Sequence, residues 1–278
     1  MSRLLLCTDL DRTLIPNGIQ PESPLARQKF SALAAHPELT LAYVSGRHLS
    51  LVEQAILEYE LPTPDWIIGD VGTSLYRQSQ HAWQPWQAWE AHIGQDWPGL
   101  TARDLRELFS AMQNLVLQEE SKQNRYKLSY YLPPAMATQA FLAEIKQRLS
   151  QNNLAANVIY SVDETADIGL LDILPARANK LHAIEFLMQQ QGFSLGATVF
   201  AGDSGNDLPV IASAIASVLV ANAAPEVITQ ALDSAREHHT EHAFYLAQGG
   251  FMGMNGNYSA GILEGVAHFH PEILTWLT

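Results

Sequence analysis

The chain has 278 residues, of which 47% are hydrophobic, and its 16 lysines and arginines against 29 aspartates and glutamates give a net charge of -13. This length suits one large domain or two unequal ones, and the acidic balance argues against a nucleic-acid partner or an anionic membrane surface, both of which need basic patches. The single cysteine, Cys7, excludes an intramolecular disulfide, and the first apolar run is too short for a signal or a membrane span, so we expect a cytoplasmic protein.

The first eighty residues alternate short apolar runs with helical patterns. We expect strands at 4–8, 39–44 and 66–69, and helices at 25–35 and 49–59. This alternation predicts βαβ units around a parallel sheet, in which the loops at the carboxyl ends of the strands form the site.

Two carboxylates follow the first apolar run, in the stretch Asp9-Leu10-Asp11-Arg12-Thr13. Residues i and i+2 of an extended chain point the same way, so we expect Asp9 and Asp11 on one face, close enough to share a divalent cation. Asp9 is the candidate nucleophile, because an ionised carboxylate can attack phosphorus. Asp11 is the candidate acid and base for the leaving oxygen and the attacking water.

A phosphate seat is predicted where the second strand ends, in Val44-Ser45-Gly46-Arg47. The Ser45 hydroxyl and backbone N–H groups at a helix N-terminus would hold an anion there. The alternative is that Ser45 is an ordinary helix N-cap.

The pattern changes after the third strand. A span rich in tryptophan (83–97) precedes a helix at 102–112, strands at 115–118 and 126–132, a helix at 135–149, and strands at 156–160 and 168–174. We interpret this part as an α+β domain inserted into the core. The predicted division is core 1–82, inserted domain 83–176 and core 177–278.

The βα alternation then resumes, with helices at 180–190, 207–211, 225–232 and 260–268 and strands at 198–201 and 217–220. Asp203 and Asp207 follow the strand at 198–201 and repeat the acidic pair of the N-terminus, with Ser204 and Asn206 able to orient them. We expect Asp9, Asp11, Asp203 and Asp207 to converge around Mg²⁺, whose preferred ligands are hard oxygens. Lys180 opens a helix and could offset the charge of the nucleophile and the phosphoryl group. Together these residues predict a magnesium-dependent phosphoryl-transfer site.

Four sequence elements have now been described: the acidic pair at 9–13, the stretch 44–47, Lys180 and the acidic pair at 203–207. In this order they resemble the motifs of the phosphatases of the haloacid dehalogenase (HAD) superfamily, and the resemblance covers the whole chain. The resemblance implies a doubly wound, Rossmann-like α/β core with a parallel sheet and a smaller α+β cap of the superfamily's type-IIB branch. The second aspartate of the first motif matches the branch that uses it as acid and base.

Within that branch the chain is most similar to the sucrose-6-phosphate phosphatases. The similarity rests on the four stretches at 41–47, 127–132, 171–175 and 260–264. It implies a phosphoric monoester hydrolase of a small sugar phosphate, with Mg²⁺ as cofactor and a phosphate seat formed by Ser45, Gly46, Arg47, Lys180 and Asn206. It also implies a sugar site in the cap, formed by Gln123, Asn124, Lys127, Ser129 and Tyr131. The alternative for the 126–132 segment is an ordinary amphipathic strand.

Several alternatives stay open. The substrate could be another sugar phosphate, such as mannosylfructose phosphate, or the chain could be a non-catalytic sugar-phosphate-binding module docked on a synthase; we expect a monomer. The glycine-rich segment 249–257 is expected to be mobile and either reaches the substrate or lies in solvent. The tryptophans of 83–97 are expected to fill a small core rather than stack on a sugar, and His238, His239 and His242 to be solvated rather than to bind zinc.

Overall fold

The computed structural model describes residues 3–80, 82–163 and 168–277, and its chain divides into two compact units. The core unit comprises Met1–Pro85 and Lys180–Thr278, and the cap unit comprises Trp86–Asn179. The sequence prediction put these boundaries after residues 82 and 176.

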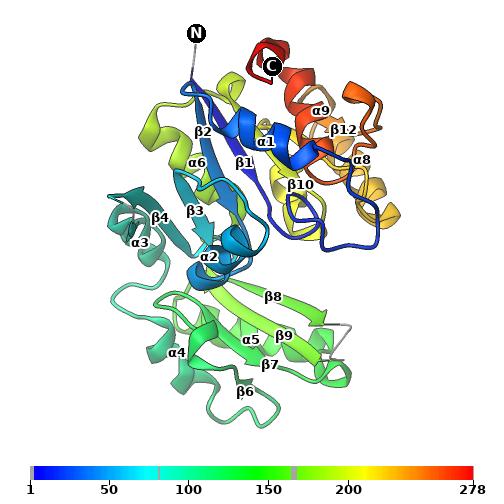
Figure 1. The fold of residues 1–278 in the computed structure, drawn as a ribbon. Helices are drawn as coiled ribbons and strands as arrows, with labels where there is room; N and C mark the ends of the chain where they lie inside the picture. Colours follow the sequence, from blue (N-terminus) through cyan, green and yellow to red (C-terminus); the bar gives the residue numbers. More distant parts are fainter. Residues whose placement is uncertain (1–2, 81, 164–167, 278) are drawn as a thin grey trace. The chain divides into compact units, whose positions relative to one another are not determined.

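An eight-stranded sheet organises the core unit, in the order β12-β11-β10-β1-β2-β3-β4-β5 (Figure 1). The six strands from β12 to β3 are parallel, and β4 and β5 run antiparallel to them. The strands are β1 (Leu4–Thr8), β2 (Leu39–Val44), β3 (Trp66–Gly69), β4 (Ser74–Ser79), β5 (Ala82–Pro85), β10 (Thr198–Gly202), β11 (Ala216–Leu219) and β12 (Phe244–Leu246).

Helices pack on this sheet because its central strands are apolar on both faces. Every residue of β1 is buried, as expected of a parallel strand covered on both sides. Leu4 and Leu6 belong to the core cluster that also contains Phe30 of α1 and Ile262 of α9. The helices α1 and α9 pack on each other. The helices of the core unit are α1 (Ala26–Ala34), α2 (Leu49–Glu58), α6 (Lys180–Gln191), α7 (Leu208–Ile211), α8 (Pro225–Glu237) and α9 (Ser259–Phe269).

The strand order reverses direction at β1, which pairs with β2 on one side and with β10 on the other. The first half of the chain builds the sheet outward through β2 and β3, and the second half builds it through β10, β11 and β12. The carboxyl ends of β1, β2 and β10 therefore meet at the switch point where open α/β sheets bind ligands.

A four-stranded antiparallel sheet, in the order β6-β7-β9-β8, forms the cap unit. Helix α4 packs on β7, and α5 packs on β8. The elements are α3 (Gln87–Ile93), α4 (Ala102–Phe109), β6 (Val116–Leu117), β7 (Leu128–Tyr131), α5 (Gln139–Gln151), β8 (Ala156–Asp163) and β9 (Ile168–Pro175).

The structure differs from the predicted elements in a few places. The strands β4, β5 and β12 were not predicted, and α5 begins at Gln139, where Thr138 accepts a capping hydrogen bond from Phe141, rather than at residue 135. The segment predicted as a helix from Asp207 starts as a 3₁₀ turn, Gly205–Asp207, before α7. Among the described residues, none of the helices has the length and apolar character that a membrane span requires.

Candidate active site

Asp9 follows the central strand and is fixed on both of its carboxylate oxygens. Its backbone N–H continues the sheet by donating to the Ala201 carbonyl at 2.9 Å. The Leu10 N–H donates to Asp9 Oδ1 at 2.7 Å, and Lys180 Nζ donates to Oδ2 at 2.7 Å. The side chain is buried, with 5% of the residue exposed. Asp9 is therefore held in one orientation at the end of β1.

The loop after β10 brings a second buried carboxylate to the same place. Asp207 Oδ2 accepts hydrogen bonds from the backbone N–H groups of Asp203 and Ser204, at 3.1 and 3.0 Å, and from the Ser204 hydroxyl. A side chain at Gly202 would meet Asp207, since a Cβ there would lie 2.5 Å from the Asp207 Cγ. Glycine is thus required for the loop to fold over this carboxylate.

Lys180, the first residue of α6, joins the two strand ends. Its ammonium donates to Asp9 Oδ2 and Asp207 Oδ1 at 2.7 Å each and to Asn206 Oδ1 at 2.8 Å. The lysine is 2% exposed. Burial alone would lower its pKa, but the charges of Asp207 and Asp9 outweigh that effect and raise the pKa, so Lys180 is a permanent cation.

Three carboxylates form a buried acidic cluster around this lysine. Asp9, Asp203 and Asp207 each offer an oxygen within 4.8 Å of the others. Thr13 donates to Asp203 at 3.0 Å, and Arg12 lies 3.4 Å from it. Burial and the Asp207 charge raise the pKa of Asp9 to about 7 and that of Asp203 to about 6. The cluster therefore holds more negative charge than Lys180 balances, and its all-oxygen donor set suits a hard divalent cation.

Asp11 does not join this cluster, so the expectation that it shares a cation with Asp9 through its side chain is corrected. Strand β1 ends at Thr8, and Leu10 accepts backbone bonds from Thr13, Leu14 and Ile15 in a tight turn. The alternation of an extended chain therefore stops before residue 11.

The carboxylate of Asp11 is instead held by two other side chains. Arg47 donates to both of its oxygens, at 2.8 and 2.6 Å, and Asn17 donates to Oδ1 at 2.7 Å. Burial alone would raise the pKa of Asp11, but the bonds and charge of Arg47 lower it.

Ser45 lies at the end of β2, next to the first strand, with 1% of the residue exposed. Its hydroxyl accepts from the Arg47 N–H at 3.1 Å, and its carbonyl accepts from Val71 at 3.2 Å. Helix α2 begins only at Leu49, after His48, so Ser45 and the exposed Gly46 belong to a strand-end loop and not to a helix N-terminus. The structure brings Ser45, Gly46 and Arg47 to the carboxyl edge that also carries Asp9.

The predicted sugar contacts all lie in the cap unit, and Ser129 is bonded to both Gln123 and Lys127. Gln123 donates to the carbonyls of Gln118 and Ser129 and accepts from the Ser129 N–H at 2.9 Å, so its amide braces the cap. Lys127 donates to Ser129 Oγ at 2.8 Å and lies 3.4 Å from Asp172. These contacts make a buried polar cluster next to β7.

The two remaining cap residues, Asn124 and Tyr131, have other partners within the cap unit. Asn124 accepts from the Tyr126 N–H at 2.8 Å. Tyr131 donates to Glu119 at 2.8 Å. Both belong to the same part of the cap as the polar cluster.

The structure also describes the tryptophans of 83–97 and the histidines near residue 240, for which we expect no role in binding sugar or zinc. Trp89 and Trp97 are fully buried in the cap unit, as a small core requires. His238 and His239 are exposed beyond the end of α8, and the metal-type cluster found among the described residues contains no histidine.

The glycine-rich segment 249–257 is not a free loop, which corrects the expectation of mobility. Asn255 donates its backbone N–H to Ser23 at 2.8 Å and its side chain to the Pro21 carbonyl at 2.8 Å. Glu264 of α9 accepts from the N–H groups of Gln248 and Gly249. The segment is thus packed onto the chain around residue 21.

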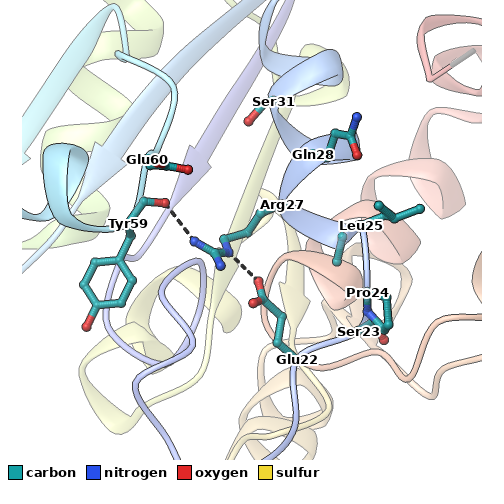
Figure 2. A pocket seen from close by; sticks show the side chains of 10 residues that line it. Glu22, Ser23, Pro24, Leu25, Arg27, Gln28, Ser31, Tyr59 and Glu60 are labelled. Carbon is teal, nitrogen blue, oxygen red and sulfur yellow. Dashed lines mark hydrogen bonds and ion pairs between the residues drawn. The ribbon is translucent and has the colours of Figure 1, made fainter.

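Figure 2 shows a hollow beside this region, lined by residues 22–28, Ser31, Tyr59 and Glu60 and about 490 Å³ in volume. Arg27 lies across it and donates to Glu22 at 2.7 Å and to the Tyr59 carbonyl at 2.8 Å. These bonds anchor the start of α1 to the end of α2.

Four residues of the site were missed as functional candidates. Thr13 and Arg12 contact Asp203, Asn17 contacts Asp11, and Asn222 donates to the Arg12 carbonyl at 2.6 Å. Asn222 comes shortly after β11, so the rule that carboxyl ends of parallel strands form the site could have found it. Asn17 has no such signal.

The comparisons with known proteins agree with this geometry. The chain is 55% identical over 275 residues to a HAD-like hydrolase of Nitrosococcus oceani, covering 99% of this chain and 74% of that protein. It is 30% identical to the mannosylfructose-phosphate phosphatase of Agrobacterium fabrum, covering 95% of this chain and 96% of that one. The crystal structure of the sucrose-phosphatase from Synechocystis, in complex with sucrose and phosphate, matches with a TM-score of 0.72 at 25% identity, covering 97% and 98% of the two chains.

The family model described as sucrose-6F-phosphate phosphohydrolase matches residues 2–270. A match of this extent, together with the doubly wound core and inserted cap, confirms the HAD fold and the hydrolase class predicted from the motifs. The chain belongs to the sucrose-6F-phosphate phosphohydrolase family of HAD phosphatases and is a phosphoric monoester hydrolase.

Proposed function

We propose that the protein is a magnesium-dependent phosphatase that hydrolyses sucrose 6-phosphate to sucrose and phosphate. The observation that carries the proposal is the buried cluster of Asp9, Asp203 and Asp207 around Lys180, in a chain whose family is described by that reaction.

The acidic cluster supports Mg²⁺ as the cofactor. Asp9, Asp203 and Asp207 would hold the ion, since their oxygens are hard ligands, and burial together with the Asp207 charge raises the pKa values of Asp9 and Asp203. A bound Mg²⁺ would supply positive charge that offsets the phosphoryl oxygens and keeps Asp9 ionised. The side chain of Asp11 is not proposed as a ligand.

The protein's own groups would carry the covalent chemistry. A carboxylate oxygen of Asp9 attacks phosphorus, and the bond from phosphorus to the sugar oxygen breaks. Arg47 keeps Asp11 ionised in the free protein, so Asp11 would first take up a proton when Arg47 turns to the phosphate, and would then give that proton to the leaving oxygen. Water then attacks the aspartyl-phosphate, Asp11 takes the proton of that water, and phosphate leaves as Asp9 is regenerated. Lys180 offsets negative charge on Asp9 and the phosphoryl group throughout.

The phosphate would be seated by the loop after β2. Ser45 offers a hydroxyl, which the Arg47 N–H orients, Gly46 offers a backbone N–H group, and the exposed Asn206 lies beside Lys180. The Arg47 guanidinium, which holds Asp11 at 2.6 and 2.8 Å, is positioned to exchange that carboxylate for a phosphate oxygen.

The sugar would be recognised by the cap. We propose that Lys127, Ser129, Tyr131 and Asn124 contact sugar hydroxyls, because a polyol is bound by amides, hydroxyls and a cation in one pocket. Gln123 would act indirectly, since its amide already bonds to the backbone on both sides.

A second candidate substrate is mannosylfructose phosphate. The chain is 30% identical to a mannosylfructose-phosphate phosphatase over almost the full length of both proteins. Both candidates are phosphorylated disaccharides, so the chemistry at Asp9 would be the same and only the cap contacts would differ.

Phosphate release from a panel of substrates, with Mg²⁺ and with EDTA, tests the proposal. We expect Mg²⁺-dependent release that is fastest with sucrose 6-phosphate, slower with mannosylfructose phosphate and slowest with simple hexose phosphates. Equal rates for all sugars would refute the disaccharide proposal, and full activity in EDTA would refute the metal. We also propose that the protein is a cytoplasmic monomer that can dock on a sugar-phosphate synthase. Light scattering, which measures the molar mass in solution, tests the monomer.

A further inference from the structure

The turn that carries Asp11 is held by a buried side chain from a distant part of the core unit. Asn222 lies in the loop after β11 and is 2% exposed. Its amide nitrogen donates to the Arg12 carbonyl at 2.6 Å, and its amide oxygen accepts from the Tyr258 N–H at 2.8 Å. Both ends of the amide are thus committed to backbone groups.

Arg12 needs such support because its backbone is in the left-handed region, with φ 57°. A non-glycine residue in that conformation costs about 1 kcal/mol or more and persists only where its surroundings hold it. From Arg12 the contacts continue to the chemistry. Its N–H donates to Asn17 Oδ1 at 2.8 Å, and Asn17 Nδ2 donates to Asp11 at 2.7 Å. Its guanidinium lies 3.4 Å from Asp203.

The other end of Asn222 is fixed by Tyr258, which directly follows the glycine-rich segment. Tyr258 is fully buried, and its hydroxyl donates to the Gln20 carbonyl at 3.0 Å. The Gly256 carbonyl accepts from Ala221 at 3.0 Å. Gly256 has φ 78°, and a Cβ there would lie 2.7 Å from the Gly249 nitrogen, so this turn requires glycine. The glycine-rich segment and Tyr258 therefore support the loop that carries Asn222.

The segment after the Asp11 turn is anchored as well. Pro21 and Ser23 accept hydrogen bonds from Asn255, and Glu22 pairs with Arg27 at 2.7 Å in the hollow of Figure 2. The turn is thus supported at Arg12 and again at residues 20–23. Between these supports lie Asn17 and the exposed Ile19.

We propose that Asn222 is a positioning residue for proton transfer by Asp11. It acts through Arg12 and Asn17 and does not touch the substrate. The inference rests on the proposed function, in which the Asp11 proton passes to the leaving oxygen as the phosphorus–oxygen bond breaks. Small displacements of a catalytic group lower the rate steeply, by about 100-fold for 1 Å.

Asn222→Asp tests the proposal. The variant keeps the oxygen that accepts from Tyr258 and places a carboxylate oxygen where the donor to Arg12 stood. With sucrose 6-phosphate at saturating Mg²⁺, we expect kcat/KM to fall about 10- to 100-fold. With p-nitrophenyl phosphate, whose leaving group needs no proton, we expect kcat/KM to stay within about threefold of the wild type, since this constant reports steps up to cleavage.

Asn17→Ala is the second variant, because Asn17 is exposed and its loss spares the core. We expect the same selective loss with the sugar phosphate. Asn157→Asp is the matched control: Asn157 also donates its amide to a backbone carbonyl, that of Ala176 at 2.9 Å, but it belongs to the cap unit. The control should change both substrates' constants by less than about twofold.

The outcomes separate the two proposals. A wild-type protein that hydrolyses neither substrate refutes the proposed function. If the wild type is active, an unchanged ratio of the two constants in both Asn222→Asp and Asn17→Ala refutes the positioning role. An equal loss on both substrates also refutes it, because a purely structural role does not distinguish leaving groups. Thermal melts in EDTA give the folding comparison without the metal.

Discussion

Replacing Lys180 by methionine isolates the electrostatic part of the site. The lysine is 2% exposed and donates to Asp9 and Asp207 at 2.7 Å each. Methionine keeps a similar length and volume but removes the charge and the donors. Removing one partner of a buried ion pair costs about 3–5 kcal/mol, because the remaining charge is left uncompensated. We expect a loss of this size in the free energy of unfolding at neutral pH.

The loss should increase with pH. Burial and Asp207 raise the pKa of Asp9 to about 7 even though Lys180 lowers it. Without Lys180 the folded-state pKa rises further, while the unfolded value stays near 3.9. Above pH 7 the folded variant therefore binds a proton that its unfolded chain has released. Its stability then falls by up to about 1.4 kcal/mol per pH unit, a slope that the wild type, whose Asp9 is by then ionised, does not share.

Thermal unfolding in EDTA between pH 6 and 9 measures the effect. For 278 residues that unfold together, a loss of about 3–5 kcal/mol lowers Tm by about 5–9 °C. Lys127→Met is the control: Lys127 is also buried, but it lies 3.4 Å from Asp172, whose side chain is 20% exposed, so we expect a smaller deficit without that slope. A deficit below about 1 kcal/mol for Lys180→Met, or one equal at pH 6 and pH 9, would refute the reasoning.

Three further predictions concern the nucleophile, the cation and the cap. Asp9→Asn should reduce phosphate release from sucrose 6-phosphate at least about 1,000-fold with an unchanged circular dichroism spectrum, and near-normal turnover would exclude the covalent mechanism. Mg²⁺ should raise Tm more at pH 8 than at pH 6, because binding at the lower pH must displace protons from Asp9 and Asp203, whose pKa values are about 7 and 6; an equal rise at both pH values would argue against these ligands. Gln123→Ala should destabilise the cap unit by about 1–3 kcal/mol, read as faster amide exchange in β7, because it removes the acceptor of the buried Ser129 N–H; unchanged exchange in β7 would contradict the bracing role.

The core of the site was predictable because it depends on a general property of parallel sheets. Asp9, Ser45 and Asp203 each follow an apolar run, and the carboxyl ends of β1, β2 and β10 meet at one edge. The sequence therefore contained enough information to bring these residues together. Lys180 opens the helix that follows the cap, and the structure brings it to Asp9 and Asp207.

Asp11 shows where this reasoning stops. The prediction extended the alternation of a strand beyond Thr8, but the Leu10 carbonyl accepts three backbone N–H groups and turns the chain. Arg12 adopts a left-handed conformation that no sequence rule assigns to arginine. The direction of the Asp11 side chain depends on Arg47 and Asn17, and these partners appear only when the loop is folded.

The cap residues and the glycine-rich segment differ from the core for the same physical reason. A strand end fixes the position of its next residue by backbone geometry alone, whereas Gln123 is placed by the carbonyls it meets. The glycines at 249–256 predict mobility from composition, yet a close approach such as that of Gly256 to Gly249 also requires glycine. Composition cannot distinguish a loop that moves from a turn packed too tightly for a side chain. Here the packed turn bonds to Ala221, next to Asn222, so variants at Asn222 and Asn17 measure whether that packing affects proton transfer by Asp11.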